Sequence, residues 1–293
     1  MVGLSLALLA AALWGLAPVA TKAALAGYSP ELISVVRLGA AATLFRLLGG
    51  AHTRWWPRSP WSWISGVALG ADFIMYNYGL RLTDAGLSGL VINVELVTTI
   101  ALAVWLLGER LTPRRVLGSA ATLAGALYVG LDGARLGGLL AADRLLGNVL
   151  VMLAGVSWSV FAVAQRRVPR GGKLFQLLTP IFFVAALTTV PGLLLPAAWR
   201  NPAGIESTAM VLVLVLACTM GVYAAYARSQ ELLDVSVLAI VLASIPMFAV
   251  AFAWLLLGEP ITARVIIGGA AILAGVLLIT VERPATAAVE RAP

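Results

Sequence analysis

The second half of this 293-residue chain repeats the first half. The segment LLGERLT at 106–112 recurs as LLGEPIT at 256–262, and in the same register Asp84 recurs as Asp234 and Tyr76 as Tyr226. Each half contains five apolar runs, and each run is long enough to cross a bilayer. Two copies of a unit with an odd number of spans must insert in opposite orientations. Inverted repeats of this kind build two gates around one midplane site in many secondary transporters.

The composition excludes an ordinary soluble domain. Hydrophobic residues make up 61% of the chain, charged residues 11%, and the mean hydropathy is +0.98. The sequence lacks the alternating segments of a β-barrel, so we expect an all-α integral membrane protein. It should have ten transmembrane helices arranged as two inverted five-helix repeats. The expected spans are 5–25, 30–48, 61–80, 84–107, 113–131, 146–166, 173–195, 208–228, 234–257 and 263–281.

The net charge of +7 follows membrane topology and does not indicate a nucleic-acid partner. With the N-terminus inside, thirteen lysines and arginines fall in cytoplasmic loops and the tail, against six at the outer side. This bias predicts that both termini are cytoplasmic in a multi-pass protein of the bacterial inner (plasma) membrane. Because all ten spans lie in one chain, a monomer could be complete.

The repeat also sets the expected domain boundaries. The first repeat covers 1–131, a periplasmic linker 132–145, the second repeat 146–281, and a cytoplasmic tail 282–293. One cysteine, Cys218, and one histidine, His52, exclude an internal disulfide and a Cys/His metal site. The sequence contains no P-loop, G-x-S-x-G or H-E-x-x-H motif. We therefore expect no enzyme activity, no cofactor and no bound metal.

Local signals mark the junction between the fourth and fifth helices of each repeat. Thr112 is a suitable N-cap before Pro113, and we interpret Glu109 and Glu259 as carboxylates that stabilise their own tight turns. Small residues recur in the fifth helix of each repeat, at a spacing that allows close helix contact in lipid. These residues, Gly118, Ala121, Gly125, Gly268, Ala271 and Gly275, predict that the fifth and tenth helices pack together as a scaffold.

The doubled Leu-Leu-Gly-Glu-x-x-Thr element, the opening Leu13-Trp14-Gly15 with Pro18, and Arg37 together resemble the EamA repeat of the drug/metabolite transporter superfamily. The resemblance implies ten helices, inverted repeats and alternating-access movement of small metabolites. Within the superfamily the chain looks most like the YddG-type exporters of aromatic and other neutral amino acids. Such proteins usually carry a proline midway along helices 4 and 9. Pro246 keeps this pattern, whereas Leu96 replaces the first proline and directs attention to the neighbouring Glu95.

Three ionisable residues lie deep inside predicted helices: Arg37, Asp72 and Glu95. A charge at this depth costs roughly 2.5–3.5 kcal/mol on insertion scales, so each needs a partner or a role. One interpretation is a structural ion pair between Arg37 and one carboxylate. The other is that a carboxylate lines the substrate pathway, where it contacts a substrate ammonium or carries a proton. Glu95 has the stronger claim, because Thr99 shares its helical face.

Aromatic side chains extend the candidate pathway. Asp72 and Tyr76 share a face of helix 3, Tyr223 and Tyr226 share a face of helix 8, and tyrosines in membrane helices can alternatively serve interfacial contacts. Trp14 and Trp158 occupy similar places in helices 1 and 6, and Pro18 and Pro246, the latter near Ser244, are candidate hinges. The predicted pathway residues are Trp14, Asp72, Tyr76, Glu95, Thr99, Trp158, Tyr223, Tyr226 and Ser244.

These observations predict a secondary transporter that exports small metabolites, amino acids including aromatic ones, by alternating access. Its partners would be this small-molecule substrate and the lipid bilayer. A rival interpretation keeps the fold and changes the cargo to lipophilic cationic drugs exported by proton coupling, with Glu95 essential. A third, from a different class, is a non-transporting membrane scaffold or a lipid-processing enzyme.

Overall fold

The computed structural model describes residues 2–82, 91–130, 142–169, 173–199, 202–257 and 261–280. These residues form ten helical spans, six of which are long and apolar enough to cross a membrane by length and composition. The expected all-helical membrane architecture is confirmed. The helices are α1 (Val2–Leu25), α2 (Pro30–Gly49), α3 (Pro60–Leu82), α5 (Val94–Leu107), α6 (Pro113–Gly130), α7 (Ala142–Arg167), α8 (Leu174–Thr189), α9 (Ile205–Val215), α10 (Val222–Leu232), α11 (Val235–Leu242), α12 (Ile245–Leu257) and α13 (Ala263–Thr280).

Local sequence explains the turn between α5 and α6. α5 ends at Gly108, whose φ of 70° lies in the left-handed region that glycine adopts without steric cost. α6 starts at Pro113, where the missing N–H leaves no helical hydrogen bond unmade. The hydroxyl of Thr112 accepts a hydrogen bond from the Arg115 N–H at 3.2 Å, so the predicted N-cap is confirmed.

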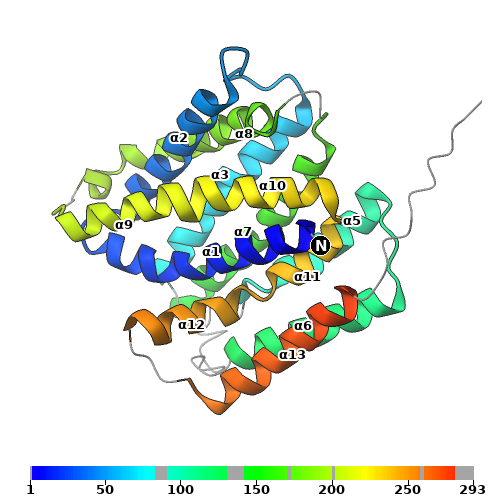
Figure 1. The fold of residues 1–293 in the computed structure, drawn as a ribbon. Helices are drawn as coiled ribbons and strands as arrows, with labels where there is room; N and C mark the ends of the chain where they lie inside the picture. The colour runs from blue at the N-terminus through cyan, green and yellow to red at the C-terminus, as the bar shows by residue number, and fades with distance from the viewer. Residues whose placement is uncertain are drawn as a thin grey trace, which may run out of the picture.

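The two halves interleave, so that the main helix contacts join one half to the other. α3 packs on α7 just as α10 packs on α1, and α5 contacts α7 just as α12 contacts α1. In Figure 1, α6 and α13 lie side by side at one edge of the bundle, while α2 and α8 lie at the opposite edge. Since these pairs correspond between the halves, the centre of the bundle lies between α1, α3, α5, α7, α10 and α12.

Three of the expected spans are not regular α-helices. In the fourth, Ile92–Asn93 form a turn after Val91, and α5 begins only at Val94, although Leu96 replaces proline there. The ninth is interrupted at Ala243–Ser244, two residues before Pro246, and resumes as α12. The eighth contains a π-helix, η4 (Leu216–Gly221), between α9 and α10. The eighth span remains one helix over Ile205–Leu232, and the interruption of the ninth lies near Pro246, the candidate hinge.

Other boundaries also differ from the expected ones. α1 runs through Pro18 without a break, and a hinge at Pro18 stays a prediction. α7 begins at Ala142, which makes the last residues of the expected linker 132–145 helical. The seventh span ends earlier than 195, because α8 gives way to a 3₁₀ helix, η2 (Val190–Leu194). The rest of the linker, the tail 282–293, Asp84 and Glu259 lie outside the described residues.

The predicted packing of the fifth and tenth spans is confirmed. α6 and α13 pack along their length, and their glycines allow the backbones to approach closely. A Cβ atom at Gly125 would lie 2.5 Å from the carbonyl oxygen of Gly268, and one at Gly118 would lie 2.9 Å from that of Gly275. Any side chain larger than hydrogen must therefore push the two helices apart.

Replacing Gly125 by alanine tests this contact. We expect Gly125→Ala to lower the thermal unfolding midpoint of the purified protein, because overpacking costs about 1–3 kcal/mol. Gly39→Ala is the matched control, since a Cβ at Gly39 meets nothing within 4 Å and alanine favours the helix. Equal midpoints for the two variants would contradict the close approach of α6 and α13.

Candidate functional site

An aromatic cluster fills the centre of the bundle. The ring of Trp14 on α1 lies edge-on to Trp158 on α7 at 5.1 Å between centroids, and to Tyr223 and Tyr226 on α10 at 5.2 and 5.6 Å. Phe161 on α7 contacts both tyrosines. The structure thus brings together four of the predicted pathway residues, contributed by both halves of the chain. Such a cluster can form one wall of a site for an apolar or aromatic group.

The residues that follow the two tryptophans make equivalent contacts with the interrupted helices. Gly15 lies against α12, where an added Cβ would be 2.5 Å from the Cβ of Phe248 and 2.8 Å from the backbone nitrogen of Ala249. Ser159 lies against α5, where its hydroxyl bonds those of Thr98 and Thr99 at 2.6 and 2.9 Å. Positions 98 and 99 correspond to 248 and 249 in the repeat. Each tryptophan is therefore held beside the break in a helix of the other half.

Arg37 is anchored to the π-helix of the eighth span. Its Nε donates to the hydroxyl of Thr219 at 3.0 Å and its Nη2 to the carbonyl oxygen of Cys218 at 3.2 Å. The guanidinium also lies 4.9 Å from the ring centroid of Phe73. A π-helix shifts the backbone pairing and is frequent at functional sites. Neutral oxygens of η4 thus hold this cation within the bundle.

Two carboxyl groups, those of Asp72 and Glu95, lie inside the bundle, and that of Asp72 is near the Arg37 guanidinium. Among the described residues, no salt bridge or hydrogen bond joins Arg37 to Asp72 or Glu95. The Asp72 carboxyl group is nevertheless close enough to Arg37 and to Glu95 for electrostatic interaction. It also interacts with the hydroxyl groups of Tyr76 and Tyr223. Asp72, Tyr76 and Glu95 keep partial exposure although all three lie inside the bundle. Each of these side chains therefore keeps some accessible surface in this conformation.

Glu95 owes its position to the break in the fourth span. It lies in the first turn of α5, where its own backbone N–H reaches only the carbonyl oxygen of Ile92. The N-terminus of a half-helix carries a partial positive charge that stabilises a nearby anion. Discontinuous helices place such termini at the midplane sites of several transporter folds. The start of α5 thus places the Glu95 carboxyl group in the first turn of a helix without a proline.

Two of the predicted pathway residues make structural contacts in this conformation. Thr99 is 2% exposed and bonds Ser159. Ser244 is 2% exposed and donates to the carbonyl oxygen of Val241 at 2.7 Å, across the turn between α11 and α12. Sequence reasoning did not single out Ser159 as a contact residue. Its place directly after Trp158, equivalent to Gly15 after Trp14, was the available signal.

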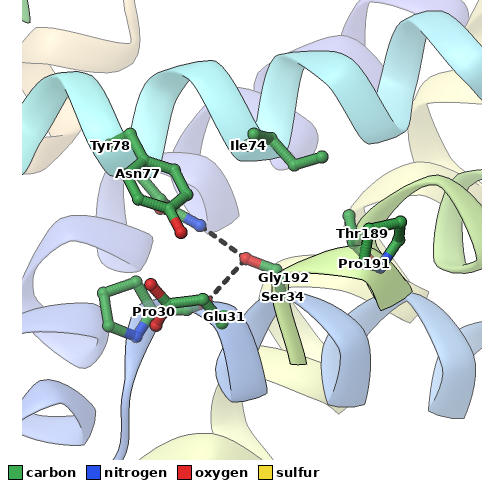
Figure 2. Close-up of a pocket in the computed structure, with 9 residues that line it drawn as sticks. All are labelled: Pro30, Glu31, Ser34, Ile74, Asn77, Tyr78, Thr189, Pro191 and Gly192. Atoms are coloured by element: carbon green, nitrogen blue, oxygen red, sulfur yellow. Dashed lines mark hydrogen bonds between the residues drawn. The ribbon is translucent and has the colours of Figure 1, made fainter. Parts of the chain in front are cut away.

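A pocket of about 230 Å³ lies away from this cluster, between α2, α3 and η2. Figure 2 shows Ile74 and Tyr78 of α3 at this pocket, and each follows Asp72 or Tyr76 by two residues, about 200° around a helix. The amide of Asn77 donates to the hydroxyl of Ser34 at 2.6 Å. The pocket therefore lies on the face of α3 opposite to the predicted pathway.

A clamp at one end of the bundle joins the two halves. It consists of Glu109, Arg115, Asp234 and Ser236, and we call it the Glu109 clamp. The carboxylate of Glu109 accepts hydrogen bonds from the N–H groups of Val235 and Ser236 at 2.7 and 3.0 Å, and from the Ser236 hydroxyl at 2.6 Å. Glu109 therefore caps α11 of the second half. The expectation that its carboxylate stabilises its own turn is wrong.

The clamp replaces the capping group that α11 would otherwise use. Asp234 occupies the N-cap position, but its side chain makes no capping bond because it forms an ion pair with Arg115. Arg115 also donates to the hydroxyl of Ser236 at 3.2 Å. Charge-assisted bonds of this kind are roughly twice as strong as neutral ones. The clamp thus fixes the α5–α6 turn to the start of α11.

Comparison with known sequences identifies the family. The sequence profile of the EamA-like transporter family matches residues 1–131 and 145–281. This chain belongs to the EamA-like transporter family. It is a transporter and not an enzyme, and the family implies two repeated halves in a lipid bilayer and a small-molecule substrate. Membership confirms the resemblance at the level of the family and leaves the narrower subtype a prediction.

Several proteins are similar to this EamA-like transporter over most of its length. An uncharacterised protein of Pseudomonas aeruginosa is 29% identical over 262 residues, which cover 85% of this chain and 87% of that protein. A probable terminal-alkyne amino-acid exporter of Streptantibioticus cattleyicolor is 26% identical over 272 residues, 91% of this chain and 89% of the exporter. A crystal structure with 23% identity matches 95% of this chain and 96% of its own with a TM-score of 0.81, which shows the fold alone.

Removing the carboxylate of the clamp should destabilise this EamA-like transporter. We expect Glu109→Ala to lower the free energy of unfolding by about 2 kcal/mol, because α11 loses its cap and a charged hydrogen-bond acceptor. Unfolding of the purified protein in mixed detergent micelles measures the change. Glu231→Ala is the control: its carboxylate pairs with the exposed Arg228 on the same helix, so it should change stability by less than about 0.5 kcal/mol. Equal losses of unfolding free energy in the two variants would show that capping by Glu109 does not stabilise the protein.

Proposed function

We propose that this EamA-like transporter exports amino acids, including aromatic ones, across the bacterial inner membrane by alternating access. The observation that carries the proposal is the combination of an aromatic cluster with an arginine and two carboxyl groups inside one bundle. A neutral amino acid needs a cation for its carboxylate, an anion for its ammonium and an apolar wall for its side chain. The amino-acid exporter of Streptantibioticus cattleyicolor, similar over nearly the whole chain, supports the same substrate class.

Each part of this substrate has a matching group in the site. Arg37 bonds to η4 through Nε and Nη2, which leaves its Nη1 for a substrate carboxylate. Asp72 and Glu95 are two carboxyl groups for one ammonium. Trp14, Trp158 and the α10 tyrosines supply the apolar wall. In this proposal the narrower relationship is to the YddG-type exporters of aromatic amino acids.

The proposal includes a topology. Repeats covering 1–131 and 146–281 would insert in opposite orientations, joined by a periplasmic linker at 132–145 and followed by a cytoplasmic tail at 282–293. Both termini would then be cytoplasmic, and so would the Glu109 clamp, since it lies between the fourth and fifth spans. An intact clamp holds the cytoplasmic ends of α5 and α11 together. This conformation would therefore be closed toward the cytoplasm, with Pro246 at the hinge of the ninth span.

Counterflow of labelled phenylalanine into proteoliposomes preloaded with unlabelled amino acids tests the substrate class. We expect the wild type to accumulate label and Tyr76→Ala to lose at least about tenfold of this activity, because a ring beside Asp72 is removed and one buried contact is worth roughly 1.4 kcal/mol or more. Tyr128→Ala is the control, because Tyr128 is 38% exposed on α6 at the edge of the bundle. If the wild type accumulates no labelled amino acid, the assignment of amino acids as substrates is contradicted.

Export of lipophilic cations is the second candidate, and the excess of carboxyl groups over arginine at the site favours a positively charged ligand. It predicts uptake of tetraphenylphosphonium that depends on a pH gradient and disappears in Glu95→Gln. The amino-acid proposal predicts that phenylalanine counterflow persists in Glu95→Gln with a severalfold lower affinity, because Asp72 still faces the ammonium. Measuring both fluxes in wild type and Glu95→Gln separates the two candidates.

A further inference from the structure

Two glutamines near the Glu109 end of the bundle are buried with unused hydrogen-bonding atoms. Gln165 of α7 is 0% exposed, and neither its Nε2 nor its Oε1 has a hydrogen-bond partner among the residues that the structure describes. Gln230 of α10 is also 0% exposed, and within the same ranges its Oε1 has no partner. Primary amides in a protein interior are almost always paired, so these three atoms need an explanation.

The two glutamines belong to one contact between α7 and α10. The Nε2 of Gln230 donates to the carbonyl oxygen of Ala162 at 2.9 Å, one turn before Gln165 on α7. The same Nε2 donates to the hydroxyl of Tyr226 at 2.9 Å. Because Gln230 spans from the aromatic cluster to the turn that carries Gln165, the amides form the polar border of that cluster toward the Glu109 end.

Gln165 also continues the aromatic face of α7. It follows Trp158 by seven residues and Phe161 by four, spacings that place all three on one side of a helix. Trp158 and Phe161 contact Tyr226, which accepts from Gln230. A ligand whose aromatic side chain lies against these rings would thus bring its polar end to the amides.

The closed packing leaves the Gln165 amide without hydrogen bonds and the Gln230 amide with an unpartnered oxygen. Both side chains are 0% exposed in this conformation, and at position 165 an apolar residue of the same size would fill the space without losing a hydrogen bond. The unused atoms therefore favour a second conformation, in which α7 and α10 separate and the amides meet water or a ligand. At the same end of the bundle, the Glu109 clamp joins the α5–α6 turn to α11 and so opposes the opening of that end.

We propose that Gln165, with Gln230, binds the substrate on its entry from the Glu109 end. A primary amide offers one acceptor and two donors, so its oxygen can accept from the ammonium of an amino acid while its nitrogen donates to the carboxylate. Closure of that end would then pass the zwitterion on to Arg37, Asp72 and Glu95. This inference rests on the proposed amino-acid function and adds a subsite for the opposite conformation.

The test replaces Gln165 by methionine, which keeps the length of the side chain and removes both polar groups. Phenylalanine counterflow by the reconstituted full chain gives KM, and thermal unfolding without substrate gives the stability. For Gln165→Met we expect a KM at least about tenfold higher, because the substrate loses two hydrogen bonds between its charged groups and the amide. We expect the unfolding midpoint to equal or exceed that of the wild type. Gln165→Asn, which keeps an amide, should recover part of the affinity.

The matched control is Gln176→Met, at the start of α8. Gln176 accepts from the backbone N–H of Lys173 and donates to the carbonyl oxygen of Gly49, so its loss should leave KM unchanged. An unchanged KM in Gln165→Met, with an active wild type, would overturn this inference alone. A lower midpoint together with lost flux would also overturn it, since the amide would then support packing. If the wild type transports tetraphenylphosphonium and no amino acid, both proposals fail, because that cation offers no hydrogen bonds.

Discussion

The rule that backbone polar groups need partners in a bilayer determines where this transporter can hold charge. Lipid supplies no hydrogen bonds, so a helix may be interrupted only where protein surrounds it. The described structure departs from regular α-helix at Ile92–Asn93, at η4 and at Ala243–Ser244, all toward the centre of the bundle. Arg37 uses the oxygens of η4, and Glu95 occupies the half-helix terminus beyond the first break. The polar site therefore depends on the interruptions.

Because the two halves interleave, each interrupted helix packs against helices of the other half. Each tryptophan of the cluster stands beside a break contributed by the other half, through Gly15 in one case and Ser159 in the other. The same chemistry is not used twice: a glycine allows direct backbone contact with α12, whereas a serine hydroxyl joins α7 to two threonines of α5. The duplicated framework is thus nearly symmetric, and the side chains at its centre are not. A substrate with two different polar ends requires such asymmetry.

Features that depend on local sequence could be predicted from the chain. The left-handed turn at Gly108, the Thr112 cap and the contact of α6 with α13 follow from residue type and spacing over a few turns. Positions of the central aromatic residues also followed, because the repeat identifies equivalent places in the two halves. The coarse fold was therefore accessible before any coordinates.

Features that depend on distant contacts could not be predicted. No residue type marks η4, whose π-helix is paired with Arg37 across 182 positions of sequence. The break before Glu95 has no proline to announce it. The sequence predicts that the Glu109 carboxylate stabilises its own turn. In the structure Asp234 forms an ion pair with Arg115, so α11 lacks its own capping side chain and Glu109 caps it instead. No local sequence pattern indicates this exchange. In each case, the partner is chosen by the packing of the two halves.

The cap on α11 also orders the assembly of the chain in time. Its acceptor, Glu109, precedes Val235 by 126 residues, so the loop that carries it leaves the ribosome before the ninth span exists. The second half can then complete that span against a group that is already in place. Until then the Glu109 carboxylate of the first half lacks its protein partner and is solvated by water at the membrane surface. The two halves are therefore unequal during biosynthesis, because the earlier one carries a capping group that the later one uses.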